Sequence, residues 1–283
     1  MFGTVAVNGT VQRWEELRLQ DFPSAFFFGA GFFETFLVRG GEPMFLERHL
    51  SRLSASLAAH AHCVQAPPAE VLSAASVREA LNRCLQADAA MGPGFTGVGK
   101  LTAADGRLLL SFRPLAPNHE DLQRQGRSLD EVESTLYRRG DRTLQHKSLS
   151  YLRQHQHMGP LPVFLNEVGE VCEVPNANLF LHLGDALVTP PVDAPCLPGI
   201  VRSVLLEAGR VAGLPVVERP VPSAELSDVR GCLLTNSVGL AIGVTRLLRQ
   251  PLPGSIELAQ QTRGTIEAIA SVPSPSIRGG STT

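Results

Sequence analysis

Lysine is scarce in this sequence, so a side-chain amine that can lose its proton is an uncommon group here. Among 283 residues only Lys100 and Lys147 are lysines, and nearly all other positive charge is arginine. Arginine stays protonated, whereas a desolvated lysine can lose its proton and form a Schiff base. Lys147 precedes an apolar run that we interpret as helical. It is our candidate covalent catalyst, although a surface lysine at a helix start would have the same local sequence.

Three other segments have residues suited to binding an anionic phosphate. Arg52 lies beside the leucine stripe of a predicted helix, and Leu197-Pro-Gly-Ile-Val-Arg202 has a glycine just before another predicted helix. The first N–H groups of a helix lack partners and, with the helix dipole, favour anions. Thr235-Asn-Ser237 follows an apolar strand and supplies hydroxyl donors. Each feature alone is also compatible with ordinary loop chemistry.

A carboxylate, Glu173, stands inside an otherwise apolar pair of predicted strands. Burying it would be unfavourable without a cationic or hydrogen-bonding partner, and a protonated pyridine nitrogen is such a partner. Alternatively, Glu173 lies on a solvated strand face and Asn178 fills a turn or a strand edge.

Composition argues against several classes of function. The chain is 43% hydrophobic and 18% charged, with a formal net charge of -2, and so lacks the basic surface that nucleic acids or anionic membranes require. No basic leader or membrane-length apolar run is present, which predicts a cytoplasmic protein. The five scattered cysteines predict reduced, mostly buried thiols. Neither His60 and His62 nor His155 and His157 make a metal clamp, because residues two apart point to different helix faces.

The first 116 residues predict an α+β domain with an antiparallel sheet. Gly29-Ala-Gly31 lacks the third glycine and the context of a dinucleotide-binding loop, so we interpret it as close-packed backbone leading into a strand that ends at Gly40-Gly41. The remaining elements expected here are a hairpin (4–7 and 11–14, with an Asn8-Gly9 turn), helices over 46–60 and 69–86, and a second hairpin (98–103 and 107–112).

Pro114, Pro117 and Asn118 begin a polar, helix-poor stretch through Gly126, which predicts a domain boundary. We expect a second domain over 117–270 and a disordered tail over 271–283, which is rich in Ser, Pro and Gly. The second domain should contain strands over 163–166, 171–174, 179–183, 186–189, 214–219, 232–235 and 241–244, and helices over 199–211 and 256–270.

Taken together, these segments resemble the class IV aminotransferases, the fold-type IV enzymes that use pyridoxal 5'-phosphate. The resemblance extends from about residue 8 to residue 247. It rests on six motifs in the family's order: Phe28-Gly-Ala-Gly-Phe-Phe33-Glu-Thr, His49-Leu-Ser-Arg52-Leu, Lys147-Ser-Leu-Ser-Tyr151, Glu173 five residues before Asn178-Leu-Phe, Leu197-Pro-Gly-Ile-Val-Arg202, and Thr235-Asn-Ser237.

The resemblance implies a role for each residue around the cofactor ring. Lys147 would form the Schiff base and later move the proton, while Glu173 would keep the pyridine nitrogen protonated so that the ring withdraws electrons. Tyr151 stands where many members have a tyrosine near the ring hydroxyl. Phe33 takes a position, tyrosine in some members, that helps to shape the substrate pocket.

The resemblance also implies how the phosphate is held. Arg52, the backbone amides of Ile200 and Val201, and the Ser237 hydroxyl would bind it. The family often has threonine where Val201 and Ser237 stand, so Val201 loses a hydroxyl contact and Ser237 keeps one. No metal is implied.

The family implies a homodimer with a two-domain fold, in which a small α+β domain and a larger pseudo-barrel domain enclose the cofactor. This chain most resembles the 4-amino-4-deoxychorismate lyases, which release 4-aminobenzoate and pyruvate for folate biosynthesis. An aminotransferase acting on branched-chain or D-amino acids is the alternative, and a non-catalytic cofactor-binding dimer is a third reading. Arg107, Arg113 and Arg142 are candidates for binding substrate carboxylates.

Overall fold

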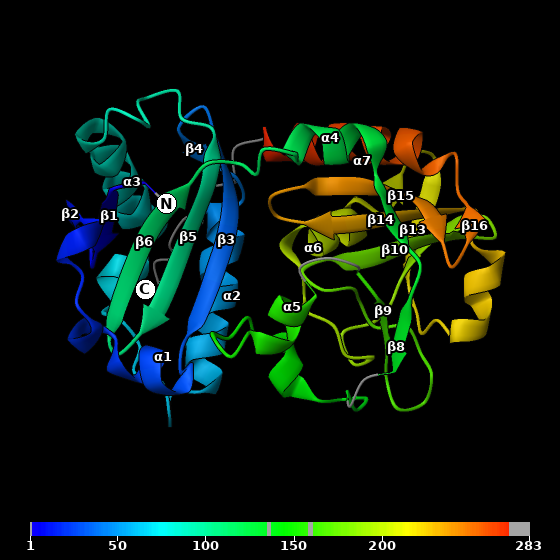
Figure 1. Cartoon of the computed structure of the whole chain (residues 1–283), viewed down its shortest axis with the longest axis horizontal. Helices are drawn as coiled ribbons and strands as arrows, with labels where there is room; N and C mark the ends of the chain where they lie inside the picture. Colours follow the sequence, from blue (N-terminus) through cyan, green and yellow to red (C-terminus); the bar gives the residue numbers. More distant parts are fainter. Residues whose placement is uncertain (1, 135–136, 158–160, 272–283) are drawn as a thin grey trace, which may run out of the picture.

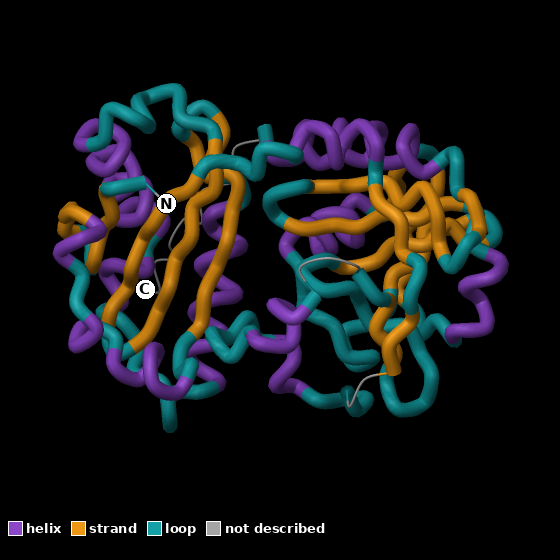
Figure 2. Tube along the Cα trace, in the orientation of Figure 1, coloured by secondary structure: helices purple, strands orange, loops and turns teal. Residues whose placement is uncertain are grey.

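The computed structural model describes residues 2–134, 137–157 and 161–271, and two sheets organise them. The strands of the first sheet rise steeply in the view of Figure 1, whereas the central strands of the second sheet lie nearly flat beside them. Figure 2 shows helices packed along both sheets and a short helix between them. In the described part of the chain, no helix is both long and apolar enough to span a membrane.

The first sheet has six antiparallel strands in the order β2-β1-β6-β5-β3-β4. Their bounds are β1 Thr4–Val7, β2 Thr10–Arg13, β3 Phe32–Arg39, β4 Glu42–Pro43, β5 Gly97–Ala104 and β6 Arg107–Arg113. Both predicted hairpins are confirmed. Asn8 and Gly9 have φ angles of 47° and 80°, the positive values that a tight two-residue turn requires.

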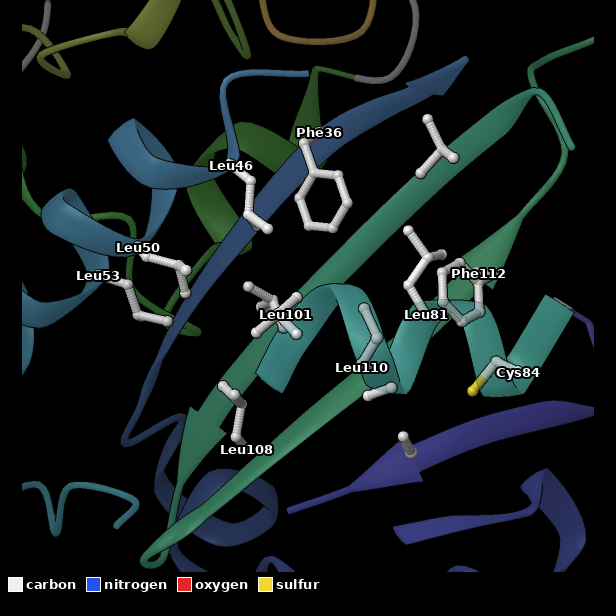
Figure 3. Packing of buried hydrophobic residues seen from close by; sticks show 14 of the residues in the cluster. Phe36, Leu46, Leu50, Leu53, Leu81, Cys84, Leu101, Leu108, Leu110 and Phe112 are labelled. Carbon is white, nitrogen blue, oxygen red and sulfur yellow. The ribbon is translucent and has the colours of Figure 1, made fainter. Parts of the chain in front are cut away.

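Two helices, α2 (Leu46–Ala59) and α3 (Ala74–Ala87), cover one face of this sheet. Leucines of α2 and α3 point towards Phe36 of β3 and towards the leucines of β5 and β6 (Figure 3). The predicted helix over 69–86 begins later than expected. Residues Ala69–Leu72 form a 3₁₀ turn, and the Ser73 side chain then caps α3 by accepting a hydrogen bond from the Ser76 amide.

The second sheet has the order β12-β13-β11-β10-β14-β15-β16, with β7 pairing parallel to β15. A separate parallel pair joins β8 (Val132–Ser134) to β9 (Val163–Leu165). The bounds are β7 Arg127–Leu129, β10 Asn178–Leu183, β11 Ala186–Thr189, β12 Arg210–Val211, β13 Leu214–Glu218, β14 Gly231–Asn236, β15 Leu240–Leu247 and β16 Gln250–Pro251.

Both faces of the second sheet are buried. Helices α6 (Ile200–Ala208) and α7 (Ser255–Ala270) pack on one face through a cluster that includes Phe180 and Leu233. The other face packs against a larger aliphatic cluster that includes Leu179 and Leu234. Residues 171–174, predicted as a strand, make only isolated bridges, at Val171 and Val174.

The prediction that residues 114–126 are poor in helix is wrong, because α4 (His119–Gln125) lies there. The negative charges of Glu120 and Asp121 in its first turn interact favourably with the helix dipole. Arg124 forms an ion pair with Asp121 at 2.7 Å. Leu122 packs against the aliphatic cluster of the second sheet. Tertiary packing therefore stabilises a helix that the polar sequence of this segment does not predict.

The helix predicted over 199–211 is shorter than expected. It ends at Ala208 because Gly209 adopts a left-handed conformation with φ 67°, and Arg210–Val211 turns back to pair with β13. The short helices α1 (Pro23–Phe28) and α5 (Leu152–Gln156), and the 3₁₀ turns Trp14–Glu16, Leu19–Asp21, Arg142–Gln145 and Ser223–Asp228, complete the chain.

The two sheets divide the chain between Arg113 and Arg127. Domain bounds of 1–116 and 117–270 stay a prediction. Of the tail expected to be disordered, residues 272–283 lie outside the described residues.

Candidate active site

Lys147 lies on an irregular segment that is fixed to the edge of β3, and the next helix in the described chain is the five-residue α5. The Phe33 amide donates to the Lys147 carbonyl at 2.9 Å, and the Leu149 amide donates to the Gly31 carbonyl at 2.9 Å. The apolar helical run predicted after Lys147 is wrong, since α5 begins only at Leu152, whose side chain is 72% exposed. Backbone pairing with β3 therefore positions the lysine.

The Lys147 amine points into an aromatic corner. Its Nζ lies 4.7 Å from the centroid of the Phe33 ring and 3.5 Å from the Tyr151 hydroxyl, and the two rings meet edge to face. Burial, with the nearby Arg52 charge, lowers the pKa of Lys147 to about 8. At pH 7 about a tenth of the amine is therefore neutral, far more than for an ordinary lysine, and the neutral form is the one that a nucleophile or base requires.

Tyr151 connects this corner to the end of β14. Its hydroxyl donates to the side-chain oxygen of Asn176, whose backbone carbonyl accepts a hydrogen bond from the Asn236 amide group at 3.3 Å. Burial raises the pKa of Tyr151, so the phenol stays protonated and able to donate. Asn176 was not predicted as a site residue, although asparagine directly after Pro175 is typical of a turn. Its φ of 68° shows the left-handed turn conformation that asparagine tolerates.

Glu173 is enclosed by neutral donors. Both of its hydrogen bonds go to Oε2, from the Leu197 amide at 3.0 Å and from the Asn178 side chain at 3.4 Å. No ion pair joins it to any residue that the structure describes. Burial raises the pKa of Glu173 to about 7, even though the Leu197 amide and the Lys147 charge act in the opposite direction. The carboxylate is suited to binding a cationic N–H group.

Asn178 does more than fill a turn. It is buried, and its side-chain amide also donates to the Leu197 carbonyl at 2.8 Å, so it holds the loop that leads into α6. A Cβ atom on Gly199 would lie only 2.0 Å from the Asn178 oxygen. Glycine is therefore required at this position, and the missing side chain lets the start of α6 approach the start of β10.

The start of α6 has the features of an anion site. No side chain caps it at Gly199, so the amides of Ile200 and Val201 are free of such a partner. Arg52 reaches it from α2, donating from Nη1 to the Pro198 carbonyl at 2.8 Å. The structure thus places two of the three predicted phosphate-binding segments next to each other.

The third predicted segment contributes a buried hydroxyl. Thr235 is 1% exposed, and its Oγ1 has no hydrogen-bond partner within the described chain. It lies opposite Asn178 in the sheet, on the face that Leu233 presents to α6. Ser237, the predicted phosphate ligand, makes no hydrogen bond to a described residue, and its assignment stays a prediction.

Several charged residues near the corner were not singled out from the sequence. Lys100 projects over the same Phe33 ring, 4.5 Å from its centroid, and burial together with Arg113 lowers the pKa of Lys100. Glu34 and His49 form a buried cluster with Arg52. Of the predicted carboxylate-binding arginines, Arg107 pairs with Asp21 at 3.5 Å. The described residues contain no group of three side chains that could hold a metal ion.

Comparison with known proteins identifies the relatives of this arrangement. The chain is 24% identical over 254 residues to the aminodeoxychorismate lyase of Bacillus subtilis, with 86% of each protein covered. A 4-amino-4-deoxychorismate lyase structure from Pseudomonas aeruginosa matches with a TM-score of 0.74 and 26% identity, covering 94% of this chain and 99% of that one. A hypothetical aminotransferase from Mycobacterium tuberculosis in its PLP-bound form matches with a TM-score of 0.78 and 23% identity, at the same coverage.

These structural matches confirm the predicted fold class, a mixed α and β fold-type IV architecture. A sequence model of the family described as amino-transferase class IV matches residues 31–247, which include Phe33, Lys147, Glu173 and the start of α6. The chain therefore belongs to the class IV aminotransferase family.

Proposed function

We propose that this protein is a lyase that converts 4-amino-4-deoxychorismate to 4-aminobenzoate and pyruvate with pyridoxal 5'-phosphate as its cofactor. The observation that carries the proposal is the Lys147 amine, held in an aromatic corner with its pKa lowered to about 8. Glu173 and the start of α6, joined to each other through Leu197 and Asn178, complete the site.

Pyridoxal 5'-phosphate is the cofactor of this family, and the donor set fits it. The orphaned Thr235 hydroxyl, the uncapped start of α6 and the Arg52 guanidinium suit a phosphate. Glu173, enclosed without a cationic partner in the described chain, suits a protonated ring nitrogen. When bound, the cofactor supplies an aldehyde carbon for a primary amine and an electron-withdrawing ring.

Lys147 acts as both anchor and base. Its neutral amine would hold the cofactor covalently until the substrate amine takes its place. Once released, Nζ takes the proton from the substrate ring carbon, at the end of a side chain whose orientation Phe33 and the Tyr151 hydroxyl restrict. A lysine pKa near the working pH suits this proton transfer.

Glu173, Arg52 and the α6 amides hold and tune the site without reacting. An ionised Glu173 keeps a bound N–H group cationic, and this increases the electron withdrawal on which proton removal depends. Arg52, Ile200, Val201 and Ser237 bind the phosphate, while Tyr151 lies beside Lys147, near the ring. Because loss of the enolpyruvyl group creates an aromatic product, the site needs mainly a placed base and correct orientation.

The choice of the lyase over an aminotransferase rests on the relatives. The Bacillus subtilis lyase aligns over most of both chains, and the Pseudomonas aeruginosa lyase has higher sequence identity than the Mycobacterium tuberculosis protein. An aminotransferase is the second candidate, because a probable branched-chain-amino-acid aminotransferase of Synechocystis is 26% identical to this chain over 107 residues. In that reaction Lys147 would return the proton to the cofactor carbon.

A coupled assay separates the two reactions. Protein loaded with cofactor is supplied with 4-amino-4-deoxychorismate, and 4-aminobenzoate and pyruvate are measured together. The lyase predicts equal amounts of both products and their loss in Lys147→Ala. Transfer of an amino group from branched-chain or D-amino acids to 2-oxoglutarate, with no aromatic product from 4-amino-4-deoxychorismate, would overturn the lyase assignment.

The protein is further proposed to act as a homodimer. The support is an exposed aromatic surface on α1, where Phe26, Phe27 and Phe28 are 59%, 69% and 78% exposed. Consecutive exposed phenylalanines commonly mark an interface. Light scattering should give the mass of two chains, and a triple substitution of these residues by serine should reduce it to that of one.

A further inference from the structure

A buried cluster of three ionisable side chains lies behind β3, on the face covered by α2. Glu34 is 1% exposed, His49 is fully buried, and the Arg52 side chain is 11% exposed. Glu34 Oε1 accepts from Arg52 Nε at 2.8 Å, and Oε2 accepts from Arg52 Nη2 at 2.6 Å. His49 Nδ1 lies 2.6 Å from the same Oε2.

These contacts leave two N–H groups of the guanidinium without a partner in the described part of the chain. A guanidinium carries five N–H groups. Glu34 takes one at Nε and one at Nη2, and the Pro198 carbonyl takes one at Nη1. The remaining N–H groups, one on Nη1 and one on Nη2, belong to the two nitrogens furthest from the chain, beside the residue that precedes Gly199 and the start of α6.

Charge keeps this arrangement intact over a wide pH range. Burial alone would raise the pKa of Glu34, but the Arg52 charge and the hydrogen bonds from His49 and Arg52 lower it to about 2. Burial lowers the pKa of His49, so the ring is neutral and its Nδ1–H donates to the carboxylate. The hydrogen bond to Glu34 and packing against Phe36 hold the His49 ring. Its other nitrogen, Nε2, has no partner within the described chain.

We propose that Glu34, supported by His49, is a positioning residue that directs the two remaining N–H groups of Arg52 towards the cofactor phosphate. This inference rests on the proposed function, because it requires Arg52 to bind that phosphate. Glu34 itself touches neither cofactor nor substrate. It orders a long side chain in advance, so that binding the phosphate does not have to immobilise it.

The Glu34 carboxylate also has an opposing effect, because its negative charge repels a phosphate. The repulsion is weakened by Arg52, which lies between the two anions and makes the pair neutral. Without the carboxylate, a mostly buried guanidinium would turn towards other acceptors and lose its orientation. We therefore expect removal of Glu34 to weaken phosphate binding, and tighter binding would contradict the proposal.

The test compares two ligands that differ only in the phosphate. Dissociation constants for pyridoxal 5'-phosphate and for pyridoxal are measured on cofactor-free protein, and their ratio gives the preference for the phosphate. Glu34→Gln should reduce this preference on the order of tenfold or more, as for other residues that orient a ligand-binding group, while pyridoxal binds as in the wild type. Unchanged pyridoxal binding also shows that the variant is folded.

Glu207→Gln is a matched control. Glu207 accepts two hydrogen bonds from Arg48, at 2.6 and 2.7 Å, and this pair also joins α2 to α6, but at the exposed surface. The Glu207→Gln variant should prefer the phosphate as strongly as the wild type does. A general loosening of the contact between α2 and α6 would instead lower the preference in both variants.

Arg52→Lys separates failure of this inference from failure of the proposed function. If Arg52→Lys keeps the full preference, Arg52 does not bind the phosphate and both proposals fail on this point. If Arg52→Lys loses the preference but Glu34→Gln keeps it, only the positioning role of Glu34 is overturned. Should Glu34→Gln not fold, Glu34→Asp decides, because a carboxylate one methylene shorter keeps its charge but cannot hold both arginine nitrogens. Glu34→Asp should show a reduced preference for the phosphate, and an unreduced preference would overturn the positioning role of Glu34.

Discussion

Glu34 and Glu173 are both enclosed, and their surroundings change their pKa values in opposite directions. Glu34, on the face of β3 that α2 covers, has an arginine and a histidine within hydrogen-bonding distance, and its pKa is lowered to about 2. Glu173, beside the start of α6, is bonded only to amide N–H groups, and burial raises its pKa to about 7. Burial acts similarly on both, so the difference comes from their partners.

The comparison suggests a division of work. A carboxylate whose charge is already balanced stabilises the position of its neighbours, and Glu34 holds Arg52 in this way. A carboxylate that is buried without a cation has unused capacity to stabilise one, and Glu173 lies where a protonated ring nitrogen would use it. The same residue type therefore serves as a support in one region and as a binding group in the other.

The largest predicted effect comes from Lys147, which lies close to both regions. Lys147→Ala removes the only group that can bind the cofactor covalently and take the substrate proton in this proposal. We expect 4-aminobenzoate formation to fall by on the order of a thousandfold or more. A product assay on cofactor-loaded protein checks this, and a loss of less than about tenfold would rule out the assigned role.

The two glutamates should separate in kinetic experiments. Glu173→Gln removes the charge that keeps a bound N–H group cationic, so kcat should fall on the order of a hundredfold while the preference for the phosphate is kept. Glu34→Gln should show the converse, a reduced preference with a smaller effect on kcat at saturating cofactor. Equal kcat losses in both variants would remove the distinction between them.

Stability against pH offers a smaller but more direct test of the contrast. A carboxyl group whose folded pKa is raised binds more protons in the folded state, so its contribution to stability declines as pH rises from about 4.5 to about 7. Urea unfolding of cofactor-free protein should therefore show that Glu173→Gln gains about 1–3 kcal/mol on the wild type between pH 5 and pH 7.

For Glu34 the sign is reversed. Its lowered pKa contributes stability that is fully present above pH 4.5 and is lost only as pH falls towards about 2. Glu34 should therefore contribute no slope between pH 5 and pH 7. If the unfolding free energies of the wild type and Glu173→Gln change in parallel over that pH range, the pKa of Glu173 is not raised.

The smallest predicted effect concerns the pH at which Lys147 becomes reactive. Only the neutral amine captures an aldehyde, so the rate at which cofactor-free protein binds pyridoxal covalently should rise with pH and level off above about 8. An ordinary lysine would continue to gain reactivity towards pH 10. Stopped-flow absorbance follows the reaction, and a profile still rising at pH 10 would contradict a buried, tuned amine.

The sequence indicated Lys147, Glu173 and Arg52 only together, through the order of six motifs, because each alone is compatible with an ordinary surface or loop position. Apolar patterns identified the strands of the first sheet except the two-residue β4, and both helices that cover the sheet. The helix α4 was missed because it is a polar segment after two prolines, and packing through Leu122 stabilises it. Glu34 and Asn176 escaped notice because their partners lie far along the chain. Their importance depends on contacts that only the folded structure creates.

The central claim is that Lys147 is the lysine that binds the cofactor, and the sequence supplies its own comparison. Lys100, the other lysine, lies over the same Phe33 ring. Protein loaded with pyridoxal 5'-phosphate is reduced with borohydride and digested, and the modified peptide is identified by mass spectrometry. We expect one cofactor per chain, attached to Lys147. Attachment to Lys100, or to neither lysine, would contradict it.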